Sequence, residues 1–152
     1  MRPEDTEAAA AIENENFSRP WKKQGFLDAV CSPNALYFVA EQEGEIVGYA
    51  GLWVALDEGE ITNVSVKPPC WGQHVGRKLM NAMLEAGNRA GVVSFFLEVR
   101  ESNVRAISLY TSCGFEAVGV RKNLYEAPTE NGIIMCKLCN SSDRSAHSLR
   151  RP

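Results

Sequence analysis

The chain contains 152 residues, 45% of them hydrophobic, which supplies one apolar core and predicts a single domain. The 16 Lys and Arg residues against 19 Asp and Glu residues leave a net charge of −3, so the composition argues against nucleic acid as a direct partner. Because no apolar run approaches the ~20 residues that span a bilayer, and residues 2–5 do not start a secretion segment, we expect a cytoplasmic protein without a membrane partner.

Two helices are expected near the N-terminus. Asp5 and Thr6 are helix-capping residues ahead of an alanine-rich stretch at 8–12. Apolar residues recur at near-helical spacing over 21–30, and the Ser-Pro pair that follows ends this second helix.

Three strands follow. Residues 36–40 and 46–54 are β-rich runs joined by a polar connector with one glycine, which predicts a hairpin. The third run, 60–67, changes the phase of its apolar residues midway, and a one-residue bulge would restore the alternation. A bulge also splays a strand away from its neighbour.

The second half of the chain alternates helices and strands. Leu79, Ala82, Met83, Ala86 and Ala90 predict an amphipathic helix that ends at Gly91. The remaining expected elements are a strand at 93–100, a helix that starts near residue 102 or 103 and ends at 114, and strands at 115–120 and 132–138. The polar tail at 140–152 is expected to be disordered, which leaves a single domain at 1–139.

The cysteines indicate neither a disulfide framework nor a metal site. There are five of them, scattered along the chain and mostly in apolar stretches, as is usual for reduced structural thiols. Cys136 and Cys139 form one C-x-x-C, but a strand over 133–138 would point them to opposite faces. We therefore predict no metal ligands.

Three features carry candidate chemistry. The loop that contains Gly72 and Gly76 lies between a strand and a helix, where backbone N–H groups can approach a phosphate. Its spacing is neither that of a Walker loop nor G-x-G-x-x-G. Glu98 lies on the polar face of the apolar strand 93–100, and Tyr110 lies on the last helix beside Ile107. Taken singly, each also fits a solvated or core position.

The order of these segments resembles the GNAT acetyltransferase superfamily. The resemblance covers nearly all of 1–139 and is most specific at Leu97-Glu98-Val99-Arg100 with Ser102-Asn103, Ala106-Ile107-Ser108-Leu109-Tyr110 and Gly114-Phe115. Within the superfamily, Phe17-Ser18-Arg19-Pro20-Trp21, Gly48-Tyr49-Ala50-Gly51-Leu52-Trp53 and Gly119-Val120-Arg121-Lys122 resemble the RimI type, the ribosomal-protein-alanine N-acetyltransferases.

The resemblance implies an α/β (α+β) GNAT fold, with a mixed, mostly antiparallel sheet splayed by a bulge and about four flanking helices. It also implies acetyl-CoA as cofactor and a protein N-terminus, that of a ribosomal protein, as the substrate. Glu98 corresponds to the general base of this type and Tyr110 to the general acid. The positions implied to bind the cofactor are Val64, Ser65, Val66, Gly72, Gln73, His74, Val75, Gly76, Arg77 and Asn103.

The chain departs from the family pattern in two places. The phosphate loop carries Trp71 where the family usually has Gln or Arg, and His74 where it usually has Gly. If position 74 needs a positive φ, histidine adopts it at a cost that glycine avoids. The family also usually has a first strand that ends near Arg2-Pro3, so we expect either that this strand is shortened here or that the recorded start is internal.

The pKa of the attacking amine bears on the substrate. An α-amino group, with a pKa near 7.7 to 8.0, gives up its proton to a carboxylate more readily than a lysine side chain, with a pKa near 10.4. The difference of roughly 2.5 in pKa corresponds to about 3.4 kcal/mol and favours an N-terminal amine. The open alternatives are a GNAT enzyme that acetylates a small amine or a lysine side chain, and a non-catalytic acyl-CoA-binding or interaction module.

Overall fold

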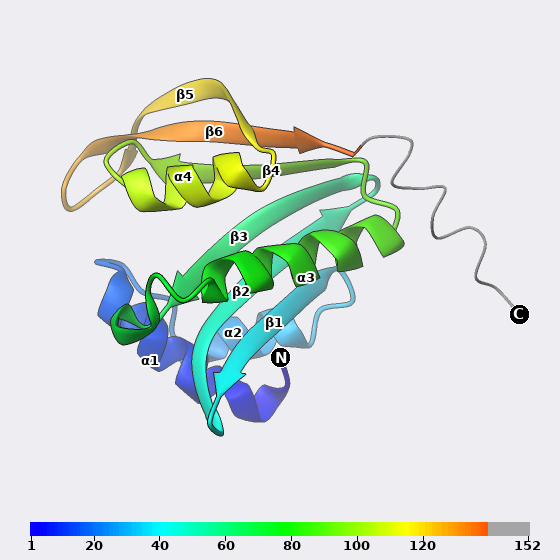
Figure 1. Ribbon diagram of the computed structural model, residues 1–152, viewed down its shortest axis with the longest axis vertical. Helices are drawn as coiled ribbons and strands as arrows, with labels where there is room; N and C mark the ends of the chain where they lie inside the picture. Colours follow the sequence, from blue (N-terminus) through cyan, green and yellow to red (C-terminus); the bar gives the residue numbers. More distant parts are fainter. Residues whose placement is uncertain (140–152) are drawn as a thin grey trace, which may run out of the picture.

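The computed structural model describes residues 1–139, so the predicted tail at 140–152 lies outside the described residues (Figure 1). Four α-helices are present in this part of the chain: α1 (Thr6–Asn16), α2 (Lys23–Val30), α3 (Val75–Arg89) and α4 (Val104–Ser112). The strands are β1 (Ala35–Gln42), β2 (Glu45–Ala55), β3 (Glu58–Val66), β4 (Ser94–Arg100), β5 (Glu116–Tyr125) and β6 (Glu130–Leu138). Single 3₁₀ turns at Pro3–Asp5 and Pro68–Cys70 precede α1 and follow β3.

The six strands form one sheet in the order β1-β2-β3-β4-β6-β5. Every neighbouring pair is antiparallel except β3 and β4, which run parallel. Helices α1 and α2 cover one face of the sheet and α3 covers the other, as Figure 1 shows. Successive side chains of β2 point to opposite faces of the sheet, and each face has its own hydrophobic cluster. Tyr49 packs in the cluster that contains Phe26 of α2, and Ala50 packs in the cluster that contains Met83 of α3. The expected mixed, mostly antiparallel fold with four helices is confirmed.

Strand β3 contains the predicted bulge. Gly51 of β2 pairs with Asn63, but the next residue, Leu52, pairs with Ile61, so Thr62 is the extra residue. Beyond this point β3 and β4 separate: their register comprises only three rows, from Glu58 opposite Ser94 to Glu60 opposite Phe96. The rest of β3 and β4 diverges, and the sheet opens between them.

Helix α3 buries a slightly different stripe from the one that the apolar spacing suggests. Leu79 and Met83 are buried as expected, but Ala82 and Ala90 are exposed. The buried stripe is completed by Val75, Met80, Leu84 and Gly87. The alanines misled the prediction because a methyl group tolerates either environment.

The N-terminal residues form a 3₁₀ turn rather than a shortened first strand. No strand precedes α1 in the described part of the chain, and the α-amino group of Met1 donates a hydrogen bond to the carbonyl oxygen of Tyr37 on β1 at 2.7 Å. None of the helices within 1–139 is both long and apolar enough to cross a membrane.

Candidate active site

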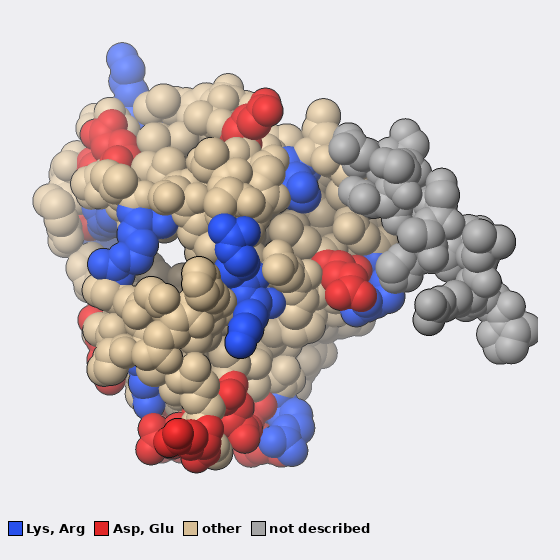
Figure 2. Space-filling model, in the orientation of Figure 1, with Lys and Arg blue, Asp and Glu red and all other residues tan. Residues whose placement is uncertain are grey.

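A cleft of about 860 Å³ opens where β3 and β4 separate. It is lined by the end of β3, the loop before α3, the first turn of α3, and helix α4 with the loop before it. Figure 2 shows this region as a hollow in the surface with Lys and Arg side chains on its rim, between the positions of α3 and α4 in Figure 1. The volume lies within the range of ligand and cofactor sites.

Ten of the twelve predicted site residues line this cleft. They are Val64, Ser65, Val66, Gly72, His74, Val75, Gly76, Arg77, Asn103 and Tyr110. The two others lie outside its lining. Gln73 turns away, and its side-chain amide donates to the carbonyl oxygen of Pro69 at 3.2 Å. Glu98 lies on β4, on the strand face opposite that of the buried Leu97 and Val99.

The loop before α3 presents backbone donors to the cleft. Gly72 has a φ of 77° and His74 a φ of 60°, so both residues are left-handed, and His74 is the residue that precedes the helix. The N–H groups of the first turn of α3 have no acceptor within the helix, because the first such bond runs from Lys78 to the carbonyl oxygen of His74. Such a helix start suits an anion. The positive φ suspected at residue 74 is therefore observed.

Asn103 also has a structural role. Its side-chain oxygen accepts a hydrogen bond from the backbone N–H of Ala106 at 3.2 Å, which caps the start of α4. Asn103 lines the cleft at the same time. The capping bond uses the side-chain oxygen and not the amide N–H₂ group.

Glu98 is partly exposed and paired. Its Oε1 accepts a hydrogen bond from the guanidinium of Arg121 on β5 at 2.5 Å, and 34% of the Glu98 side chain is exposed. The second carboxylate oxygen has no ion-pair partner among the described residues. The carboxylate is thus anchored at one oxygen and open at the other.

Tyr110 is buried between α4 and the core, where its ring packs 6.2 Å from that of Phe115. Burial raises the pKa of the Tyr110 hydroxyl well above its ordinary value, and Tyr125 and Cys113 raise it further. Tyr125, at the end of β5, is close enough to interact electrostatically with both Tyr110 and Glu98.

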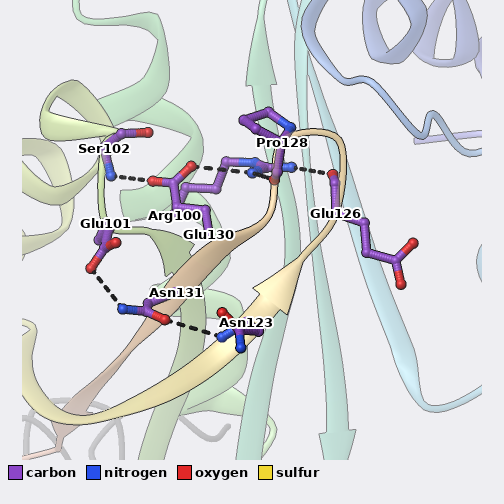
Figure 3. Close-up of polar contacts among 8 residues, drawn as sticks. All are labelled: Arg100, Glu101, Ser102, Asn123, Glu126, Pro128, Glu130 and Asn131. Carbon is purple, nitrogen blue, oxygen red and sulfur yellow. Dashed lines mark hydrogen bonds and ion pairs between the residues drawn. The ribbon is translucent and has the colours of Figure 1, made fainter.

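A polar network fixes the loop between β4 and α4 against the turn between β5 and β6 (Figure 3). Glu130 accepts a hydrogen bond from the backbone N–H of Ser102 at 2.5 Å and pairs with Arg100 at 3.2 Å. Arg100 also donates to the carbonyl oxygens of Pro128 and Glu126, at 3.1 and 3.0 Å. The hydrogen bonds from Ser102, together with Arg100, lower the pKa of Glu130. This network positions the residue just before Asn103.

Sequence reasoning did not assign Tyr125, Arg121 or Arg105 to the site, although Arg121 lies in one of the motifs that carry the resemblance. Tyr125 and Arg121 lie on β5, an outer strand whose polar second half gives no alternating pattern. Arg105 lies in the first turn of α4 among exposed residues. Only the pairing of β5 with β6 brings Tyr125 and Arg121 to the site, and no local signal in the sequence reports that pairing.

Comparison with known proteins agrees with this architecture. The acetyltransferase (GNAT) family matches residues 5–115. A protein of Bacillus subtilis (strain 168) is 37% identical over 136 residues, which cover 89% of this chain and 90% of the relative. The ribosomal protein bS18-alanine N-acetyltransferase of Escherichia coli (strain K12) is 35% identical over 128 residues, 84% of each chain.

Solved structures give the same picture. The crystal structure of the ribosomal-protein-S18-alanine N-acetyltransferase from Escherichia coli superposes with a TM-score of 0.83 at 32% identity, covering 93% of this chain and 94% of the other. Ard1 from Thermoplasma volcanium superposes with a TM-score of 0.85 at 24% identity, over 93% and 95%, which is evidence for the fold alone.

Proposed function

Since this chain belongs to the GNAT acetyltransferase family and is an acetyl-CoA-dependent N-acetyltransferase, we propose that it acetylates the N-terminal alanine of a small-subunit ribosomal protein, with Glu98 as general base and Tyr110 as general acid. The observation that carries the assignment of roles is the opening between β3 and β4, because Tyr110 lines it and Glu98 lies on the polar face of β4, one of the two strands that separate there. The substrate is proposed from the names of relatives that match most of the chain.

The residues around the cleft fit the cofactor. The left-handed loop residues and the free N–H groups at the start of α3 suit its diphosphate. The inner edge of β3, from Val64 to Val66, does not pair with β4 and lines the cleft, where we expect its backbone groups to face the amide-bearing pantetheine arm. The Val66 carbonyl oxygen already accepts hydrogen bonds from the side chains of Asn16 and Trp71, at 3.0 and 2.8 Å. Acetyl-CoA supplies the acetyl group as a thioester.

Glu98 acts on the attacking amine. An amine attacks a carbonyl carbon only when it is unprotonated, so a base must take its proton, directly or through water. Arg121 holds one carboxylate oxygen of Glu98, and the other is available to receive that proton. An α-amine needs less help from the site than a lysine side chain, because its pKa is lower by roughly 2.5.

Tyr110 acts on the departing sulfur. Because burial raises the pKa of Tyr110, the hydroxyl stays protonated at neutral pH and can donate a hydrogen bond. A thiol has a pKa near 8.5, below that of this phenol, so full transfer of the proton to sulfur is uphill. Tyr110 therefore assists mainly by donating a hydrogen bond as negative charge develops on the sulfur.

The proposal is tested by acetylation assays on three acceptors: a peptide with a free N-terminal alanine, the same peptide blocked at its N-terminus but containing lysine, and a polyamine. We expect turnover on the first to exceed the others by about 100-fold or more. Equal or faster acetylation of the blocked peptide or the polyamine would contradict the substrate assignment.

Variants test the roles of the two residues. Glu98→Gln and Tyr110→Phe should each lower kcat by about 100-fold or more, since general acid-base groups contribute roughly 10²- to 10⁴-fold. Cofactor affinity, measured by calorimetry, should stay within about twofold of wild type, because neither change removes a phosphate contact. Glu116→Gln, an exposed carboxylate on β5, is the matched control and should keep full turnover. Unchanged kcat in Glu98→Gln or Tyr110→Phe would refute the corresponding role.

A further inference from the structure

Trp71 and Arg105 face one another across the mouth of the cofactor cleft. Trp71 belongs to the loop before α3 and is 45% exposed, and its indole N–H donates to the carbonyl oxygen of Val66 at 2.8 Å. Arg105 belongs to the first turn of α4, and its guanidinium carbon lies 3.5 Å from the centre of the Trp71 ring. The pair therefore connects the end of β3 to the start of α4.

A second contact joins α3 to α4 across the cleft. Arg77 of α3 donates to the Ser112 hydroxyl of α4 at 2.6 Å and to the Ser112 carbonyl oxygen at 3.5 Å. All four residues of these two contacts line the cleft. Figure 2 shows a hollow in the surface with basic side chains on its rim. A molecule that enters the cleft between α3 and α4 passes both arginines.

The charge at this opening is positive. Arg77 and Arg105 line the cleft, and the carboxylate that shares the lining is Glu15. Arg77 already donates hydrogen bonds to Ser112, whereas Arg105 has no ion-pair partner within residues 1–139. Arg105 is therefore the cation of the cleft with the most donors to offer.

The stacking leaves those donors accessible. A guanidinium has five N–H donors, all in its own plane, and contact with an aromatic ring uses its face. At 3.5 Å the Arg105 guanidinium lies in direct contact with the indole face. The hydrogen bond to Val66 fixes Trp71, and Trp71 in turn holds Arg105 in place. The N–H donors on the edge of the guanidinium stay available for another partner. A planar edge of N–H donors matches the oxygens of a phosphate.

We propose that Arg105 binds a phosphate group of the acyl-CoA cofactor and that Trp71 is the residue that positions it. The proposal rests on the use of acetyl-CoA and adds a contact from α4 to the anion site at the start of α3. Coenzyme A carries a diphosphate and a phosphate monoester on its ribose, and both present the same chemistry to Arg105. Dephospho-CoA, which lacks the monoester, distinguishes the two.

The test is titration calorimetry of coenzyme A and dephospho-CoA into wild type and Arg105→Gln. The affinity of coenzyme A should fall by roughly tenfold or more in Arg105→Gln, as expected for loss of a charge-assisted hydrogen bond. If the monoester is bound, dephospho-CoA affinity is the same in both proteins. If the diphosphate is bound, both ligands weaken by the same factor. Either pattern supports the proposal and identifies the phosphate.

The positioning role of Trp71 is tested separately. Trp71→Ala should weaken coenzyme A binding, whereas Trp71→Phe should retain most of the affinity because a ring face remains. In the double variant, Trp71→Ala should add little to the loss caused by Arg105→Gln, since both changes remove the same contact. A purely structural Trp71 would instead give additive losses.

Arg89→Gln is the control for lost charge, because Arg89 pairs with Glu85 on α3 and does not line the cleft. It should bind coenzyme A as wild type does. The proposal is overturned if Arg105→Gln, shown by its melting curve to be folded, has an affinity for coenzyme A within twofold of that of wild type. The acetyltransferase function would stand in that case. If wild type itself shows no heat with millimolar coenzyme A, both the proposal and the cofactor assignment fail.

Discussion

Glu13 makes the stability of the protein depend on pH. It lies on α1, is 3% exposed, and accepts a hydrogen bond from the backbone N–H of Trp21 at 3.3 Å, while its other oxygen is buried without a partner. Burial raises the pKa of Glu13 from its ordinary value of 4.5 to about 7, against the lowering effect of the Trp21 hydrogen bond. The folded state therefore prefers the protonated form.

The sign and size follow from this preference. Below pH 4.5 Glu13 is protonated in both the folded and the unfolded state, and no free energy is lost. As the pH rises from about 4.5 to about 7, the unfolded chain ionises first and the folded state is progressively destabilised. A pKa difference of about 2.5, at about 1.36 kcal/mol for each pKa unit, gives a loss of about 3 kcal/mol above pH 7. That is a large fraction of the ~5–15 kcal/mol of a typical domain.

Glu13→Gln removes this titration while keeping the shape of the side chain. The free energy of unfolding of Glu13→Gln, relative to wild type, should rise by about 3 kcal/mol between pH 4.5 and pH 8, as measured by urea denaturation at each pH. Any cost of burying the Gln amide is the same at both pH values and cancels. Glu7→Gln, on the exposed side of the same helix, is the control. A difference between Glu13→Gln and wild type that stays constant from pH 4.5 to 8 would refute the reasoning.

Three further predictions concern the loop, the core and the network. His74→Gly should raise Tm by a few degrees. A left-handed backbone strains histidine by roughly 1–2 kcal/mol, and glycine relieves this strain, although the greater freedom of glycine in the unfolded chain offsets about half of the benefit. A lower Tm would contradict this. Gly87→Ala should lower the free energy of unfolding, measured by urea denaturation, by about 1–3 kcal/mol, because the added methyl group would lie 2.5 Å from the buried Phe95 ring. Unaltered stability would contradict this and mean that the ring moves easily. Glu130→Gln should lower Tm at neutral pH, and the difference in Tm from wild type should shrink as the pH falls. The lowered pKa of Glu130 means that its carboxylate stabilises the fold only while it is ionised. A difference in Tm that is constant with pH would count against the Ser102 contact.

The sequence predicted most where structure is periodic. Alternation along 93–100 placed Glu98 on the face away from Leu97 and Val99, and the structure agrees because β4 is paired along its whole length with β6. The phase change in β3 likewise predicted a bulge, observed at Thr62. In both cases a period of two leaves little freedom in the direction of a side chain.

The sequence predicted least where direction depends on a tight loop or on distant pairing. Gln73 was expected at the cofactor, but between the left-handed Gly72 and His74 the chain turns its side chain toward Pro69. Tyr125 was not expected at all, because its place near Glu98 results from the irregular register of β5 on β6. Such positions are set by tertiary contacts rather than by spacing.

The three-row contact between β3 and β4 gives the protein an edge in the middle of its sheet. Beyond Glu60 and Phe96 the two strands do not pair with each other, and backbone groups at such an edge can pair with another extended chain. We expect the amide-bearing arm of the cofactor to lie along this edge, in the place of the missing strand. If acetyl-CoA covers this edge, the cofactor-free protein should be the more prone to aggregate, which light scattering with and without cofactor would measure.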